Sequence, residues 1–96
     1  MNKEELQKSK ELAVESAIRW VITGKDYSSM KYDVNKYMEA YTANNNQGYN
    51  QEQILLDRNT IALEISLTII NVLGSKKEQL LYKELREIAY DIPSNR

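Results

Sequence analysis

Residues 61–70 read IALEISLTII, and the fold depends on whether this stretch is a strand or a helix. Its large aliphatic residues fall on every second position from Ile61 to Ile69, which is the period of a half-buried strand. No other segment of the sequence alternates in this way, so such a strand would have no partner. Wound as a helix, the same region has one broad apolar face, made of Ile54, Ile61, Ala62, Ile65, Ile69, Val72 and Leu73. We therefore predict a helix.

A second apolar face of this helix contains Leu56, Leu63, Leu67 and Ile70. It either packs on a neighbouring helix or is left for a partner, and the sequence slightly favours burial. Arg58 projects into the middle of the first apolar face. Its stem can pack there while its guanidinium reaches a helix end or a carboxylate such as Glu15 or Asp33. We favour this interpretation over a direct role for Arg58 in binding a partner.

Two helices are predicted before this one, over about residues 3–23 and 28–43. Gly24 is placed to end the first, and the Asn-rich run at 44–48 is predicted to be a loop. Both helices carry apolar residues at spacings of three and four, as amphipathic helices do. These stripes consist of Leu6, Ala13, Val14, Ala17, Ile18, Trp20 and Val21 in the first helix, and Tyr27, Met30, Val34, Tyr37, Met38 and Tyr41 in the second.

Capping signals set the limits of the third and fourth helices. Asn50 and Gln53 have the spacing of a capping box, and the third helix would run from there to Gly74, which can adopt a left-handed turn. Ser75 and Glu78 form the standard S-x-x-E box of the fourth helix. Its apolar stripe consists of Leu81, Leu85, Ile88 and Ile92, and the proline that follows prevents the helix from continuing.

Four amphipathic helices joined by short links predict an all-α fold, an antiparallel up-down four-helix bundle. A chain of 96 residues has room for one core of this kind, so residues 1–96 are expected to form a single domain. The third helix, which is apolar on two sides, should be the most buried of the four.

The composition excludes several kinds of chemistry. The chain has no cysteine and no histidine, so disulfides, thiolates and imidazole ligands or bases are absent. No motif indicates a metal or nucleotide site, and we predict a non-enzymatic protein without a cofactor. The N-terminal segment lacks the apolar core of a secretory signal, and the longest run without a charged residue, at 65–75, is too short to span a bilayer. A cytoplasmic location is therefore expected.

Two blocks of the third and fourth helices resemble a known family. ILLDRNTIALEIS at 54–66 and SKKEQLLYKELREIAY at 75–90 resemble the second half of the immunity proteins for pediocin-like (class IIa) bacteriocins, the enterocin A immunity family. Arg58, the Ile65–Ser66 step and the run from Lys83 to Ile88 occupy the positions that carry this resemblance. The second helix, with MKYDVNKYMEAY, also suits the family pattern.

The resemblance implies an antiparallel four-helix bundle that is cytosolic, partly membrane-associated and non-enzymatic. It implies protection of the producing cell, by binding the mannose phosphotransferase permease from inside when bacteriocin is bound outside. Specificity would lie in the C-terminal half. The residues that we predict to contact the partner are Arg58, Lys83, Arg86, Tyr90, Ile92 and Arg96.

Two alternatives remain open on the sequence. One is a helical interaction or regulatory module of another class, such as a phage-type protein or an adaptor, which could form a homodimer through the second apolar face of the third helix. The other is a nucleic-acid-associated regulator that uses Lys76, Lys77, Lys83 and Arg86. A net charge of −1 argues against nucleic acid as the main partner, because a duplex-binding surface normally has a basic excess.

Overall fold

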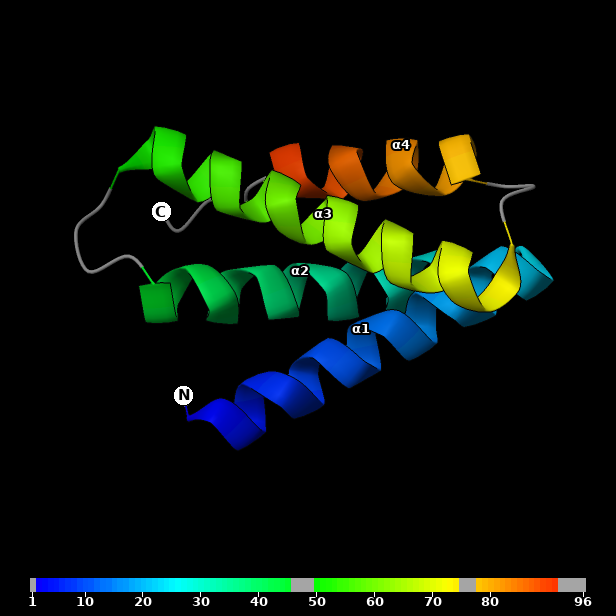
Figure 1. The fold of residues 1–96 in the computed structure, drawn as a ribbon, viewed down its shortest axis with the longest axis horizontal. Helices are drawn as coiled ribbons and strands as arrows, with labels where there is room; N and C mark the ends of the chain where they lie inside the picture. Colours follow the sequence, from blue (N-terminus) through cyan, green and yellow to red (C-terminus); the bar gives the residue numbers. More distant parts are fainter. Residues whose placement is uncertain (1, 46–49, 75–77, 92–96) are drawn as a thin grey trace.

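The computed structural model describes residues 2–45, 50–74 and 78–91, which form four helices (Figure 1). They are α1 (Lys3–Thr23), α2 (Tyr27–Asn45), α3 (Gln51–Leu73) and α4 (Glu78–Tyr90). The described residues contain no strand, and residues 61–70 lie within α3. The prediction of a helix in this stretch is confirmed.

The helices alternate in direction along the long axis of the molecule. In Figure 1, α1 and α3 run one way, and α2 and α4 run the other. Helix α1 packs mainly on α2, and α3 packs mainly on α4, while α2 also contacts both α3 and α4. The predicted all-α, antiparallel four-helix bundle is thus confirmed.

The link between α1 and α2 is short because backbone geometry stops one helix and starts the next within three residues. Gly24 has left-handed dihedral angles (φ 71°, ψ 10°), and its N–H donates to the carbonyl of Trp20 at 2.7 Å, which closes the last turn of α1. Asp26 also has a positive φ of 61°, and its carbonyl accepts the N–H of Met30 at 3.1 Å. The edge-to-face contact of the Trp20 and Tyr27 rings, 5.8 Å between centroids, packs the two helices together beside this link.

The two ends of α3 follow the prediction only in part. Asn50 Oδ1 accepts the N–H groups of Glu52 and Gln53 at 3.0 and 3.3 Å, so Asn50 is the N-cap. The side chain of Gln53 donates to Asp57 Oδ1 at 3.1 Å. Gly74 has a positive φ of 89° but an extended ψ of 173°, so the predicted left-handed turn is wrong, although a conformation that favours glycine is indeed used.

The start of α4 falls partly outside the described residues, which exclude Ser75 and therefore the hydroxyl of the predicted capping box. The helix ends at Tyr90, where the N–H of Asp91 is shared between the carbonyls of Glu87 and Ile88, at 3.1 and 3.2 Å. Such sharing is common at helix ends.

The core lies between the four helices and draws on every predicted stripe. Small residues of α1 face larger residues of the other helices, which lets the helices approach closely. Each buried Leu, Ile, Val or Met contributes about 1.5–3 kcal/mol of transfer free energy. The buried apolar residues are Ala13, Ala17, Met30, Val34, Tyr37, Met38, Ile61, Ala62, Ile65, Ile69, Leu81, Leu85, Ile88 and Ala89.

The second apolar face of α3 is exposed, which corrects the prediction that it would be buried. The exposed fractions of Leu56, Leu63 and Leu67 are 60%, 45% and 50%. The reason is geometric, because α1, α2 and α4 all pack on one side of α3 and no other helix of residues 2–45, 50–74 and 78–91 covers the other side. Val72 and Leu73, predicted on the inner face, are exposed as well, since they follow Ile69, the last buried residue of the helix.

Candidate functional site

Arg58 is buried in the bundle and joins three helices. Only 1% of the residue is exposed. Its Nε donates to the carbonyl of Ala89 at 2.7 Å, and its Nη2 donates to the carbonyl of Ile88 at 2.8 Å and to Asn35 Oδ1 at 2.6 Å. The interpretation that the guanidinium reaches a helix end is confirmed.

The carboxylates considered as partners for Arg58 lie elsewhere. Asp33 accepts a hydrogen bond from the hydroxyl of Ser16, a buried residue of α1, and this contact joins α1 to α2. The amide of Asn35 instead links Arg58 to Glu39 through two hydrogen bonds. Its nitrogen donates to Glu39 Oε1 at 2.9 Å, and its oxygen accepts from Arg58.

Arg58 supplies a cation to a helix end that has none of its own. The last turn of α4 contains no basic residue, yet the carbonyls at this end carry the negative end of the helix dipole. Burial lowers the pKa of the Arg58 guanidinium, and the charges of Glu39 and Asp91 oppose this effect. Arginine keeps its charge under these conditions because its ordinary pKa is so high. Arg58 therefore positions α4 and does not lie on a surface that a partner could contact.

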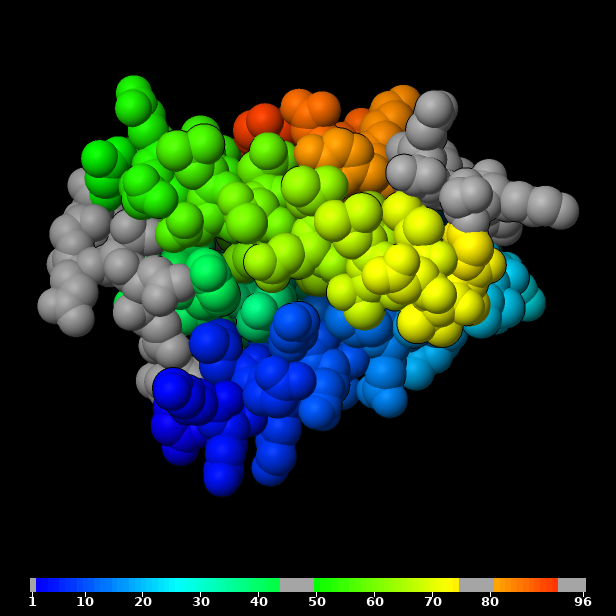
Figure 2. All heavy atoms as spheres, viewed as in Figure 1, coloured from blue at the N-terminus to red at the C-terminus, as the bar shows by residue number. Residues whose placement is uncertain are grey.

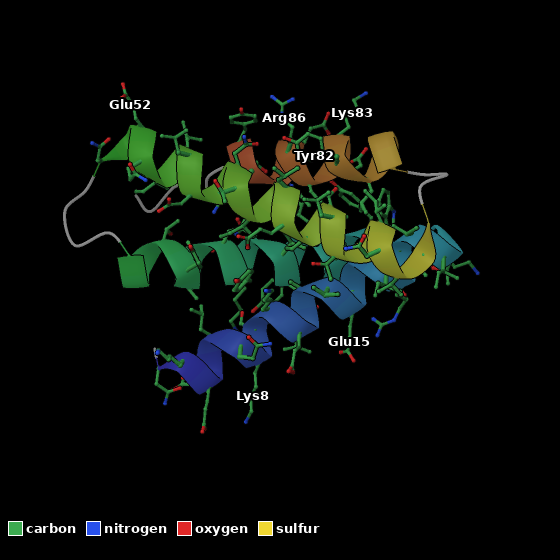
Figure 3. All side chains as sticks on the ribbon, viewed as in Figure 1. Lys8, Glu15, Glu52, Tyr82, Lys83 and Arg86 are labelled. Carbon is green, nitrogen blue, oxygen red and sulfur yellow. The ribbon has the colours of Figure 1, made fainter. Side chains whose placement is uncertain are left out.

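Three other predicted contact residues lie on the surface of α4. Lys83, Arg86 and Tyr90 are exposed, and Figure 3 shows the side chains of Lys83 and Arg86 pointing away from the other helices. The remaining two, Ile92 and Arg96, lie outside the described residues. The structure thus brings three of the six predicted residues together and places Arg58 in the interior.

Arg86 lies between two aromatic rings. Its guanidinium carbon is 5.7 Å from the centroid of the Tyr82 ring and 5.6 Å from that of Tyr90, and Nη2 lies 3.4 Å from the Tyr90 hydroxyl. The hydrogen bond with Tyr90 raises the pKa of Arg86. We call these three residues the Tyr–Arg ladder. Tyr82 was missed in the sequence, although its spacing of four residues from Arg86 was the signal that could have identified it.

The Tyr–Arg ladder lies on the flank of α4 that is turned away from α2. The opposite flank faces α2, because Lys31 Nζ lies 3.1 Å from Asp91 Oδ2. In the same region, burial and then the charge of Glu84 raise the pKa of Tyr27. The ladder is therefore exposed on the flank of α4 that lies nearer to α3, the other main neighbour of this helix.

The outer stripe of α3 consists of Leu56, Thr60, Leu63 and Leu67, all exposed. Their spacing of four, three and four places them on one side of the helix, opposite the buried isoleucines. The hydroxyl of Thr60 is used within the helix, where it donates to the carbonyl of Leu56 at 2.9 Å. Figure 2 shows α3, in green to yellow, crossing the front of the molecule with no other helix over it.

Negative charge borders the outer stripe on the side away from α4. Glu64 is exposed there, and its charge adds to burial in raising the pKa of Tyr37 on α2, which identifies this flank as the one nearer α2. Asp57 lies on the same flank, seven residues earlier. Arg58 is the only cation in the sequence of α3 and it is buried, so the surface of this helix carries carboxylates alone.

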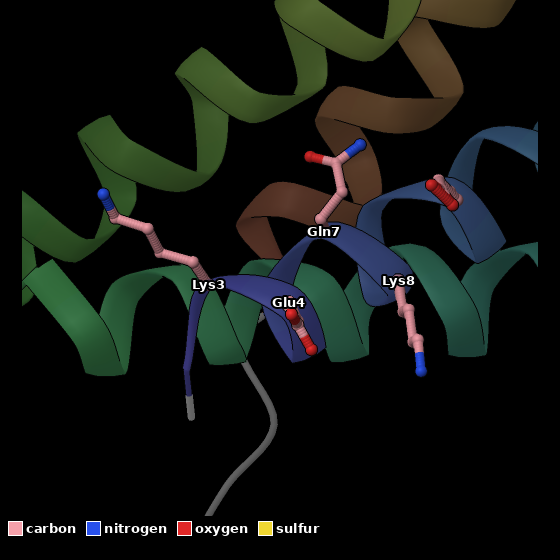
Figure 4. A pocket seen from close by; sticks show the side chains of 5 residues that line it. Lys3, Glu4, Gln7 and Lys8 are labelled. Atoms are coloured by element: carbon pink, nitrogen blue, oxygen red, sulfur yellow. The ribbon is translucent and has the colours of Figure 1, made fainter.

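A shallow hollow on α1 does not have the form of a ligand site. It is lined by the exposed residues Lys3, Glu4, Gln7, Lys8 and Glu11. All of them come from a single helix, and the labelled side chains point in different directions rather than toward a common centre (Figure 4). Among the residues described, no group of three or more carboxylate, His or Cys side chains is placed to hold a metal ion.

No helix in the described part of the chain has the length and apolarity needed to cross a membrane. No protein-family model matches the chain, and no curated protein or solved structure is significantly similar to it.

Proposed function

We propose that the protein is a bacteriocin immunity protein that acts by binding. Its partner would be the mannose phosphotransferase permease occupied by a pediocin-like bacteriocin, approached from the cytoplasmic side. Two considerations support this proposal. The blocks at 54–66 and 75–90 resemble that family, and the antiparallel bundle of this chain is the architecture expected of it.

The observation that carries the proposal is the Tyr–Arg ladder on the surface of α4, in the half of the chain where specificity is expected. Tyrosine and arginine are the residue types most enriched in binding hot spots, and a guanidinium held between two rings loses less freedom on binding. Arg58 would act as a positioning residue, since it fixes α4, and with it the ladder, relative to α3.

The decisive experiment is protection of a bacteriocin-sensitive lactic acid bacterium that expresses the protein. We expect growth in the presence of at least one member of a panel of pediocin-like bacteriocins. Arg86→Ala should reduce the protection, whereas Lys8→Ala should leave it unchanged, because Lys8 is an exposed cation of α1, away from the ladder. If the wild-type protein blunts none of the bacteriocins, the proposal is wrong.

A second candidate is an adaptor of another class, which the exposed leucines of α3 favour. The two candidates differ in their expected gene neighbourhood. An immunity gene should lie beside a gene for a small peptide with a double-glycine leader, whereas an adaptor gene has no reason to.

A further inference from the structure

We propose that the outer stripe of α3 is a self-association surface on which two copies of the chain pair through α3 with their helices parallel. The contact would be a short two-stranded coiled coil on the outside of the bundle. This inference does not depend on the proposed function.

The outer stripe has the spacing of a coiled-coil seam. If Leu56 is placed at heptad position d, Thr60 falls at a, Leu63 at d, Leu67 at a and Ile70 at d. These five positions, the outer stripe and the partly buried Ile70 that follows it, span about 21 Å of helix at 1.5 Å per residue. Parallel two-stranded coiled coils prefer Leu at d together with Ile or Val at a. Leu56, Leu63 and Ile70 supply apolar d positions here, while the a positions are Thr60 and Leu67.

The seam is available on the surface of the single chain. Its three leucines are each about half exposed, and a row of exposed leucines along one helix is the type of patch that marks an interaction site. A stable interface buries at least about 1,000 Å² in total, and a four-turn seam lies at the low end of this range. The expected complex is therefore a weak dimer, with a Kd on the order of micromolar.

Arg86 is the charge that favours the parallel arrangement, because the carboxylates of α3 oppose both arrangements. Glu52 of one copy would lie near Asp57 of the other in a parallel pair, and Asp57 would lie near Glu64 in an antiparallel pair. When two α3 helices pair in parallel, the flank of one copy that borders α4 lies over the opposite flank of the second copy. That places Arg86 of one copy near Glu64 of the other. In an antiparallel pair, Asp57 would face Glu64 and the two Arg86 side chains would lie on the same side, so like charges would meet on both flanks.

The hydrogen bonds of Arg58 fix the height of Arg86 beside the seam. Arg58 bonds to the carbonyls of Ile88 and Ala89, and α3 and α4 are antiparallel. Arg86 precedes these two residues of α4 by two or three positions. Because the helices run in opposite directions, Arg86 lies at the height of the α3 residue two or three positions after Arg58, which is about residue 61. Arg86 thus lies within about one turn of the height of Glu64, close enough for the long arginine side chain to bridge to the second copy.

The carboxylates of α3 disfavour a negatively charged membrane as the occupant of this surface. Glu52, Asp57 and Glu64 surround the leucines, and an anionic lipid surface would repel them. A second copy supplies both the leucines that cover the seam and the Arg86 that faces Glu64.

The first test measures mass by sedimentation velocity over a range of protein concentrations. Wild-type protein should shift from monomer to dimer as its concentration rises. Leu63→Lys should weaken the dimer roughly tenfold or more, because it places a charge in the centre of the seam. Leu12→Lys is the matched control, an exposed leucine of α1, and should leave the equilibrium unchanged. Circular dichroism would verify that both variants remain helical.

The second test uses the absence of native cysteine to determine orientation. In the parallel pair, Leu56→Cys and Leu67→Cys should each form a disulfide with its own copy under mild oxidation. In an antiparallel pair these variants would not cross-link alone, because each residue would be about 16 Å from its equivalent, but a mixture of the two would. A charge swap, Arg86→Glu with Glu64→Arg, should restore the dimer that either substitution alone weakens.

A monomer at every concentration overturns the proposal, as does cross-linking only in the mixture of the two cysteine variants. Pairing that requires a different protein or a lipid vesicle also overturns it. The protection assay in the sensitive bacterium reads a separate property, so failure of the dimer and failure of the proposed function can be distinguished.

Discussion

The inner and outer faces of α3 are both aliphatic, but they differ in their residues and in what covers them. The inner face carries Ile61, Ile65 and Ile69, all fully or almost fully buried by the other three helices. The outer face carries leucines that are about half exposed. Hydrophobicity alone therefore does not decide burial in this helix. The number of helices available to pack on it does, and three neighbours cover only one side.

The two arginines beside these faces differ in the same way. Arg58 is enclosed and makes three hydrogen bonds, two of them to carbonyls at the end of α4. Arg86 is exposed and contacts two tyrosine rings of its own helix. The buried arginine joins helices, whereas the exposed one presents its charge to the solvent.

The largest expected effect is that of Arg58→Ala, which should lower the free energy of unfolding by about 3–5 kcal/mol because it removes a buried charged network and the side-chain donor of the Ala89 carbonyl. Chemical denaturation measures the loss. Arg86→Ala is the matched control and should change stability by no more than about 0.5 kcal/mol. Equal losses in the two variants would contradict the contrast between the buried and the exposed arginine.

The end of α3 extends the comparison of the inner and outer faces, because its last residues, Val72 and Leu73, are exposed although they continue the inner face. Gly74→Ala should cost about 1–3 kcal/mol, since φ 89° with ψ 173° is a conformation that only glycine adopts readily. Nothing lies within 4 Å of the added Cβ, so the cost would come from the backbone alone. Val72→Ala, at a residue that is 66% exposed, is the control and should lower the free energy of unfolding by less than about 1 kcal/mol. Denaturant unfolding of the two variants measures both losses. A neutral Gly74→Ala would show that this turn is not fixed.

Two buried serines should respond to alanine with opposite signs. Ser66 is buried on α3, and its hydroxyl has no hydrogen-bond partner among the described residues, so Ser66→Ala should raise stability by up to about 1 kcal/mol. The hydroxyl of Ser16 donates to Asp33, so Ser16→Ala should lower stability by about 1 kcal/mol. Denaturant midpoints of the two variants measure the difference. A loss in both would mean that the Ser66 hydroxyl is satisfied in solution.

The sequence predicted the helices well because their signals are local. Apolar spacing and caps such as Asn50 and Gly24 depend on residues within a few turns, and the predicted limits of the first three helices differ from the observed ones by two residues or fewer. Four amphipathic helices joined by short links pack best as an antiparallel bundle, so the fold followed from the predicted helices.

The exposed face of α3 could not be predicted because burial depends on neighbours that are distant in sequence. The stripe containing Leu63 has the composition of a core, and only the positions of α1, α2 and α4 leave it open. A helix end was predicted as one possible partner of Arg58, but which end could not be predicted for the same reason, since Ile88 and Ala89 lie about 30 residues away and offer only backbone carbonyls. In the ladder, Arg86 and Tyr90 were predicted from the resemblance, but the packing of the rings on the guanidinium depends on side-chain rotamers.

The most direct test of the difference between the two faces compares Ile65→Ala with Leu63→Ala by denaturant unfolding of dilute protein, where self-association does not contribute. The two residues are neighbours on the same helix, so chain position and helix propensity are nearly matched. Ile65→Ala should lower the free energy of unfolding by about 2–5 kcal/mol, and Leu63→Ala by less than about 1 kcal/mol. Similar losses for the two variants would contradict the assignment of the inner face to stability and of the outer face to binding.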